Sequence, residues 1–496
     1  MFNFEKISTS RFYTAPTIER VVEFSPPDVD TANVAKILSL AVDAKCAGCE
    51  ANDKYARISG RTNFRLVYLD KDGEVKGVDY NADFTLDADG EFDEGDSVQC
   101  DIIVTESDVE ADETLRLTAV LEITASTIKR DETEMLTSCD DCYTIGADVY
   151  MPSYIGAKTI TTSFEDDKNV GAQIDSVLGL SAVSVIKQSL ATDGGATIGA
   201  VVFARVTYAQ DGEIKTQDFE MPIEEELSID GATSSDAVKV FSAIRSAKVV
   251  LQGVTDDNVI KVEGELSLRA MILRCEKRSI VSNLYMLTNE VEIKRDTVEL
   301  RCFDGCGYFV QNVGGTAILG DNKPRAISVS ALPYARCNTT NCYVTEDNRV
   351  VAEGVVNTDI IYTDENGYNS VRAEIPFTVS VGSEIPFSKE VRAKCDVQNV
   401  TATVRKDREF DVSMDMAISV CGFSPLSVEY VCDVTVGEEK EQNTSALSMY
   451  VASEGDDMLD VCRALTAMPE DVMAQNPDLE FPLKGNEKII YFRRLA

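Results

Sequence analysis

The sequence predicts a mostly β protein: three tandem β-sandwich-like modules followed by a small strand–helix–helix–strand unit. Three observations support this prediction. One glycine-led phrase occurs three times in register, apolar and polar residues alternate within each copy, and helical spacing is confined to about the last fifty residues. At 496 residues, the chain is long enough to bury several separate cores.

The repeated phrase is a glycine, an alternating apolar run and an acidic turn closed by a second glycine. It reads GRTNFRLVYLDKDGEV from Gly60, GAVVFARVTYAQDGEI from Gly199 and GVVNTDIIYTDENGYN from Gly354. The interval between copies is the same for the leading and the closing glycine. The closing glycines are Gly73, Gly212 and Gly367. Since Asp-Gly and Asn-Gly suit tight turns, each copy predicts a β-hairpin.

A further alternating run closes each copy, and in each run the apolar residues recur at every second position. These residues are Leu115, Leu117, Ala119, Leu121 and Ile123 in the first copy, Val262, Gly264, Leu266, Leu268 and Ala270 in the second, and Phe410, Val412, Met414, Met416 and Ile418 in the third. One apolar face per strand is what a sandwich of two sheets requires. We therefore place the three modules at residues 1–127, 150–274 and 311–420.

The segments between the modules also resemble one another. IKRDETEMLTSCDDCY begins at Ile128 and IKRDTVELRCFDGCGY at Ile293, and both end in a close cysteine pair. They lack the glycine, serine or proline richness of flexible tethers, so connectors 128–149 and 275–310 are expected to be extended strands bridging neighbouring sandwiches. The third connector, 421–447, becomes polar at GEEKEQNTS and is expected to be a flexible hinge.

Composition narrows the functional classes. The formal charge is −38, from 47 basic and 85 acidic residues, so we expect no nucleic acid partner and no attraction to anionic membranes. The chain has no histidine, which excludes Ser-His-Asp and Cys-His catalysis. A carboxylate pair remains formally open, although close pairs arise by chance at this acidic content. The expectation is a protein that is not an enzyme and has no cofactor.

The N-terminal sequence has no basic start followed by an apolar run, and no segment approaches the ~18 apolar residues of a membrane span. Synthesis in the cytoplasm, without transmembrane insertion, is therefore expected. Of the fourteen cysteines, eight form close pairs: Cys46/Cys49, Cys139/Cys142, Cys302/Cys306 and Cys337/Cys342. Free structural thiols, disulfides formed in a mature assembly and a thiolate metal site are the alternatives.

The last segment, 448–496, changes character. Met458, Val461, Cys462 and Leu465 recur at helical spacing behind Asp456 and Asp457, which suit an N-cap and a first helical turn. Pro469 opens a second helix, which stops at Asn476 and Pro477. The stretch from Lys488 to Phe492 reads as a strand that pairs with residues 449–451. The order is strand, helix, helix, strand.

This terminal segment resembles the LysM domain. The resemblance is carried by Tyr450 and Val451, then Gly455 and Asp456, and by the Asn-Pro pair after the second helix. It implies a groove between residues 454–458 and 476–481 that binds either an N-acetylglucosamine polymer or a protein. The groove residues implied are Tyr450, Gly455, Asp456, Asp457, Met458, Asn476 and Pro477. Asp457 stands where the family usually has threonine.

The three modules resemble the SipL/SPOCS family of spore-envelope proteins, through the glycine–strand–acidic turn–glycine hairpins and the ILSLAV stretch at Ile37. Tandem modules before a LysM domain are typical of that family. The resemblance implies a non-catalytic structural protein of coat and cortex morphogenesis, made in the mother cell and assembled at the spore surface. The implied partners are spore-coat morphogenetic proteins or peptidoglycan, with self-association possible. The alternatives are a cortex-glycan-binding protein acting through the LysM-like unit and a self-assembling filament or surface-layer subunit.

Overall fold

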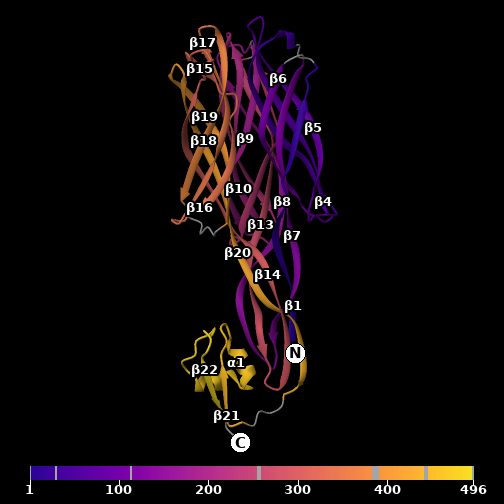
Figure 1. Cartoon of the computed structure of the whole chain (residues 1–496). Helices are drawn as coiled ribbons and strands as arrows, with labels where there is room; N and C mark the ends of the chain where they lie inside the picture. The colour runs from indigo at the N-terminus through magenta and orange to yellow at the C-terminus, as the bar shows by residue number, and fades with distance from the viewer. Residues whose placement is uncertain are drawn as a thin grey trace.

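The computed structural model describes residues 2–27, 31–111, 114–253, 258–382, 390–440 and 445–493. Strands account for 77% of the structure and helices for 4%, so the mostly β prediction is confirmed. Figure 1 shows long strands gathered into a broad body that narrows to a stalk, with a small helical unit beside the end of the stalk.

The strands before the terminal segment fall into three units. The first unit contains β1 (Phe2–Thr14), β2 (Ile18–Phe24), a 3-10 turn (Thr31–Asn33), β3 (Val34–Asn52), β4 (Tyr55–Asp70), β5 (Val75–Asp89), β6 (Gln99–Ala111) and β7 (Leu115–Cys139). The second contains β8 (Tyr143–Asn169), β9 (Ser176–Thr192), β10 (Gly195–Gln210), β11 (Glu213–Ser228), β12 (Ala237–Gln252) and β13 (Val259–Tyr285). The third contains β14 (Asn289–Ile318), β15 (Ser328–Ala331), β16 (Arg336–Val344), β17 (Arg349–Asp364), β18 (Gly367–Gly382), β19 (Glu390–Lys406) and β20 (Glu409–Glu439).

Strand order is the same in all three units. In each unit the last strand is central in one sheet, between the first strand and the penultimate one: β1-β7-β6, β8-β13-β12 and β14-β20-β19. In the first unit β2 also pairs with β7 in this sheet. The remaining strands of each unit form a second sheet, with β4, β10 or β17 at its centre. Both sheets contribute to one core: in the second unit Ile198 and Val202 of β10 pack in the same cluster as Leu266 and Leu268 of β13.

The three predicted hairpins are present as β4–β5, β10–β11 and β17–β18. Their closing glycines, Gly73, Gly212 and Gly367, have φ values of +85°, +74° and +118°. Positive φ is costly for residues that carry a Cβ, which explains why glycine recurs at these turns.

The three units join in a closed ring. The first and third meet where Ser39 Oγ donates to Asp359 Oδ2 at 3.0 Å, and the second and third meet where Arg205 Nη1 donates to the Val400 carbonyl at 2.8 Å. The first and second meet where Arg269 Nη2 donates to Ser97 Oγ at 2.6 Å. At the end of the ring far from the stalk, one apolar cluster draws on all three units; its members include Leu38, Leu178 and Ala331.

The stalk consists of three hairpin-like strand pairs, one from each unit. β1 pairs with the second half of β7, the first half of β8 pairs with the second half of β13, and the first half of β14 pairs with the second half of β20. The pairs share a core whose members include Ile7, Met135, Met151, Ile280 and Val428. Where the stalk meets the ring, aromatic and aliphatic side chains form a second cluster that includes Phe12, Leu273, Phe303 and Phe423.

The connector sequences lie in this stalk. Residues 128–139 and 143–149 belong to β7 and β8, and most of 275–310 belongs to β13 and β14. Residues 421–439 of the expected hinge form a regular strand instead: they continue β20 and pair with β14. The alternation of buried residues such as Val428 and Tyr430 with the exposed Glu429 between them explains this strand. The polar residues 441–444 lie outside the described residues.

The two IKRD phrases are not equivalent in space. Ile128 packs in the cluster where the stalk meets the ring, whereas Ile293 packs in a cluster near the other end of the stalk. The difference arises because β7 runs from the ring toward the stalk tip, while β14 runs from the tip toward the ring. The shared sequence therefore does not mark a shared position.

The terminal unit contains β21 (Leu447–Val451), α1 (Met458–Leu465), α2 (Pro469–Gln475) and β22 (Lys488–Phe492). The two strands pair antiparallel, with Met449 opposite Ile490. Side chains of both helices, such as Val461 and Val472, pack with Ile489 and with Tyr285 at the stalk tip, so the unit lies against the stalk (Figure 1).

Candidate functional site

The first loop of the terminal unit brings together three of the residues predicted to form a groove. Tyr450 OH donates to Asp456 Oδ2 at 2.6 Å, and the backbone N–H of Ser453 donates to the same oxygen at 2.7 Å. Hydrogen bonding to Asp456, with burial, raises the pKa of Tyr450 to about 12. Gly455 between them has a φ of +92°, which a residue with a Cβ rarely adopts.

This loop is fastened to the segment before β22. The Gly455 N–H donates to the Leu483 carbonyl at 2.9 Å, and the Leu483 N–H donates to the Asp456 carbonyl at 3.0 Å. The contact therefore involves Leu483 and not the 476–481 loop named from the sequence.

Asp457 has a structural role. Its Oδ1 caps α1 by accepting from the N–H groups of Leu459 and Asp460, at 2.8 and 3.0 Å. Its Oδ2 accepts from the side-chain amide of Asn283 on the stalk, at 2.6 Å. Arg463 Nη2 adds bonds to Asn283 Oδ1 and the Leu284 carbonyl, both at 3.0 Å. Asp457 therefore joins the terminal unit to the stalk.

Asn476 also has an internal role. Its Nδ2 donates to the Ile490 carbonyl at 2.9 Å, and its Oδ1 accepts from the Ile490 N–H at 3.3 Å, so it ties the end of α2 to β22. Pro477 beside it is exposed, and Met458 packs against the helical core. Of the seven predicted groove residues, Tyr450, Gly455 and Asp456 thus form a loop at the surface. Asp457, Met458 and Asn476 make contacts that stabilise the fold.

An exposed apolar face on β21 and β22 was missed by the sequence analysis. Met449 is 60% exposed and Phe492 is 61% exposed, because the helices cover only the opposite face of this two-stranded sheet. The alternation of large apolar residues along both strands could have indicated it. We call this set the terminal apolar face: Leu447, Met449, Val451, Ile490 and Phe492.

The cysteines pair differently from the sequence-local pairs, except for the Cys139–Cys142 disulfide at the stalk tip. Cys306 bonds to Cys421, which lies directly opposite it on β20, and not to Cys302, its close neighbour in the sequence. Cys302 instead contacts Cys275 of β13. Residues several positions apart on an extended strand are separated by about 3.3 Å per residue, so a neighbouring strand is closer.

Two more thiol pairs cross between sheets. Cys46 on β3 contacts Cys100 on β6, and Cys337 on β16 contacts Cys395 on β19. The thiol hydrogen bond lowers the pKa of Cys46 and raises that of Cys100. Cys49 and Cys342 remain beside these pairs as free thiols. Within the described ranges, no group of three or more cysteine, aspartate or glutamate side chains could hold a metal ion.

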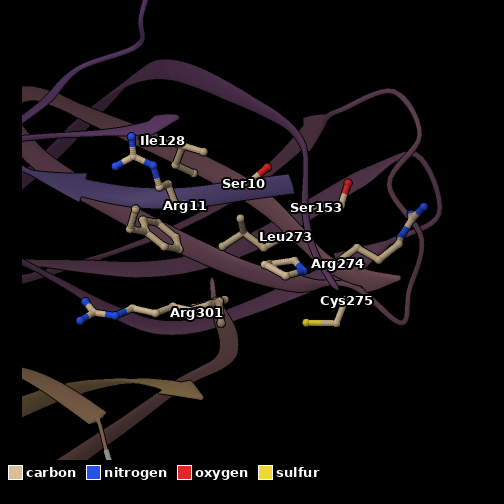
Figure 2. A pocket seen from close by; sticks show the side chains of 11 residues that line it. Ser10, Arg11, Ile128, Ser153, Leu273, Arg274, Cys275 and Arg301 are labelled. Carbon is tan, nitrogen blue, oxygen red and sulfur yellow. The ribbon is translucent and has the colours of Figure 1, made fainter. Parts of the chain in front are cut away.

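A small pocket lies where the stalk meets the ring. Figure 2 shows Leu273 near its centre, with the side chains of Arg11, Arg274 and Arg301 extending away. Its volume is about 10 Å³, which is room for about one water molecule. Arg11 is paired with Glu91 and Asp131, and Arg274 with Asp236. This pocket is therefore a small packing void and not a candidate binding site.

One comparison with known proteins found a family that matches part of the chain. Residues 334–405 match the family described as SipL, SPOCS domain. That segment is similar to a sporulation domain. It covers β16 to β19 of the third unit, including the third glycine hairpin, and it links the chain to sporulation. No curated protein and no solved structure matches the chain. No helix among the residues described is long and apolar enough to cross a membrane.

Proposed function

We propose that this chain is a non-catalytic structural protein of the bacterial endospore envelope, which holds partner proteins together during coat and cortex assembly. The observation that carries the proposal is the SPOCS similarity of the third unit, combined with the identical strand order of the first and second units. On this proposal the three units are copies of one SPOCS module, each a sandwich of two sheets.

The ring and stalk suit a scaffold. Side-chain hydrogen bonds join each pair of units, and the buried carboxylate of Asp359 makes two of them between the first and third units. It accepts from Ser39 Oγ, from the Leu40 N–H at 3.1 Å and from Arg372 Nε at 3.3 Å. Burial raises the pKa of Asp359, but its partners are structural groups in a unit interface. This environment favours an architectural role over acid–base chemistry.

The terminal unit, which we take to be LysM-like, is the proposed recruiting element. Its apolar face presents five large side chains on a rigid two-stranded sheet, and contiguous exposed apolar surface is typical of protein–protein contacts. A partner that buries Met449 and Phe492 would gain roughly 1.5–3 kcal/mol from each side chain. The neighbouring loop carries Glu454 and Asp456, which suits a partner with basic residues at its rim.

The test is affinity capture from sporulating cells with a tagged full-length chain. Recovery of spore-coat proteins that is lost on deleting residues 450–496 is the expected result. The double variant Met449→Asp/Phe492→Asp should lose the same partners, while Val310→Asp/Ile318→Asp, which alters exposed apolar residues on β14, should keep them.

Glycan binding is the competing outcome. Sedimentation with purified peptidoglycan or cortex measures it directly, because a glycan binder co-pellets in the absence of any protein partner. Co-pelleting that survives the Met449→Asp/Phe492→Asp change would overturn protein recruitment through the apolar face. Ordered polymers in purified material would instead indicate a filament or surface-layer subunit.

A further inference from the structure

The three units of the ring surround a large chamber that is partly open to solvent. The strands β3 and β6 of the first unit, β9 and β12 of the second, and β16 and β19 of the third all line one cavity of about 2020 Å³. The chamber lies between two apolar clusters, one containing Leu38, Leu178 and Ala331 and the other containing Phe303 and Phe423. All three units contribute to it, and it exists only because they close into a ring.

The charge of the lining is opposite to that of the molecule. Twelve lining residues are lysine or arginine and eight are aspartate or glutamate, whereas the whole chain has 47 basic and 85 acidic residues. A lining drawn at random from this chain would be acidic. The excess of cations is therefore a local property of the chamber, and a concave surface of one sign concentrates ions of the opposite sign.

Most of these cations have no carboxylate partner. Four form ion pairs within 4 Å: Arg61, Arg65, Arg205 and Lys394. For the other eight the described residues provide no ion pair, and only four lining carboxylates are similarly unpaired. The eight cations are Lys45, Lys168, Lys187, Lys239, Arg245, Arg269, Arg336 and Arg392.

The cations converge from different units. Burial lowers the pKa of Lys239 of β12, and repulsion from the nearby Arg392 of β19 lowers it further, while Asp101 of β6 partly offsets both effects. Arg336 adds a guanidinium whose Nε is buried without a hydrogen-bond partner. Unsatisfied donors and repelling cations are costly inside a protein unless an acceptor lies between them.

We propose that the chamber binds small multivalent oxyanions, with Arg392, Lys239 and Arg336 among the groups that hold them. A small occupant fits best, because apolar clusters lie at both ends of the chamber and side chains reach from one unit to the next, such as Arg336 Nη1 to the Val42 carbonyl at 3.5 Å. A long polyanion would also be repelled by the acidic exterior. Phosphate and carboxylate compounds share the required chemistry, since arginine pairs with both.

The test is isothermal titration of the full chain with sodium tripolyphosphate and, separately, with citrate, in sodium chloride buffer of matched ionic strength. Saturable binding of at least one probe is expected. Binding of tripolyphosphate would indicate a phosphate compound as the natural occupant, and binding of citrate would indicate a carboxylate compound. Arg392→Gln should weaken binding by about tenfold, because it removes one unpaired cation from an exposed position on β19. Arg405→Gln is the matched control, since Arg405 lies on the same strand outside the chamber and faces Asp411.

Thermal denaturation without anion checks that both variants keep the native fold. Absence of saturable binding by both probes, or equal weakening by Arg392→Gln and Arg405→Gln, would overturn the proposal. A glutamate octapeptide that binds more tightly than either probe would also overturn it, because the occupant would then be an acidic polypeptide.

Discussion

The aromatic side chain of Phe84 lies over Gly60 on the neighbouring strand. The two residues are directly opposite in the β4–β5 pair, and a Cβ added at Gly60 would lie 2.2 Å from Cζ of Phe84. Phe84 is only 6% exposed, so its ring has little room to move. Gly354 and Phe377 repeat the relationship in the third unit, where an added Cβ would also lie 2.2 Å from the Asn338 carbonyl.

Replacing these leading glycines should therefore destabilise the units unequally. Gly60→Ala and Gly354→Ala should each lower the free energy of unfolding by about 1–3 kcal/mol, the usual cost of overpacking a core. Gly199→Ala is the matched control, because its added Cβ would be 3.6 Å from Gln188 Cβ, an ordinary contact. Denaturant unfolding of the three variants measures this, and an equal loss for Gly199→Ala would contradict the explanation.

These glycines show what the sequence could predict. The repeat located each hairpin, because turn chemistry and alternation are local properties. It could not show that Gly60 and Gly354 make room for an aromatic ring, while Gly199 lies opposite Glu224. Likewise, the residues around Asp457 in the sequence could not show that it docks the terminal unit on the stalk instead of lining a groove. Its partner Asn283 lies 174 residues away. The ring and its chamber depend entirely on such distant contacts.

Docking of the terminal unit can be tested at Asn283, whose side chain is 1% exposed and bridges Asp457 and Arg463. Asn283→Leu removes these hydrogen bonds to the partly buried side chains of Asp457 and Arg463, which costs about 1–3 kcal/mol. The terminal unit should then separate from the stalk more often. Limited proteolysis should release the terminal unit faster than it does from the native chain, and small-angle scattering should show a larger radius of gyration.

Asn312→Leu is the control for that experiment, since Asn312 is an exposed amide on β14 that bonds Asp415 and Ser413 away from the terminal unit. An unchanged cleavage rate for Asn283→Leu would mean that the apolar contacts around Tyr285 hold the unit by themselves.

The thiol pairs between sheets predict specific cross-links. With oxidised glutathione, the two thiols of a pair lose their protons and two electrons to form a disulfide, and the oxidant is reduced to two glutathione molecules. We expect Cys46–Cys100 and Cys337–Cys395 cross-links, each raising the melting temperature by a few degrees. Peptide mass spectrometry without reduction identifies them. Cys46–Cys49 or Cys337–Cys342 products would contradict the structure.

The second unit offers a matched comparison, because Ser184 of β9 and Ser242 of β12 are hydrogen-bonded at 3.0 Å across the corresponding pair of strands. The double change Ser184→Cys/Ser242→Cys should create a third cross-link under the same oxidation. Its failure to form would show that the second unit is spaced differently at this edge.

Lys239 makes stability depend on pH in the alkaline range. Its pKa is lowered to about 8 by burial and by the nearby Arg392, with Asp101 opposing, and the rings of Phe12, Phe241 and Phe423 surround its ammonium group. In the unfolded chain lysine titrates near 10.4. Between about pH 8 and 10 the unfolded state therefore binds more protons, so this lysine's contribution to stability rises with pH.

The variant Lys239→Met removes that titration. At pH 7 it should be more stable than the native chain by about 1–3 kcal/mol, the cost of a buried charge less the lost cation–π attraction. The difference should shrink as pH approaches 10, because the native lysine becomes neutral there. Urea unfolding of both chains at pH 7, 8.5 and 10, in chloride buffer without multivalent anions, measures it. A difference that stays constant with pH would show that Lys239 keeps an ordinary pKa and that its neighbours do not destabilise its charge.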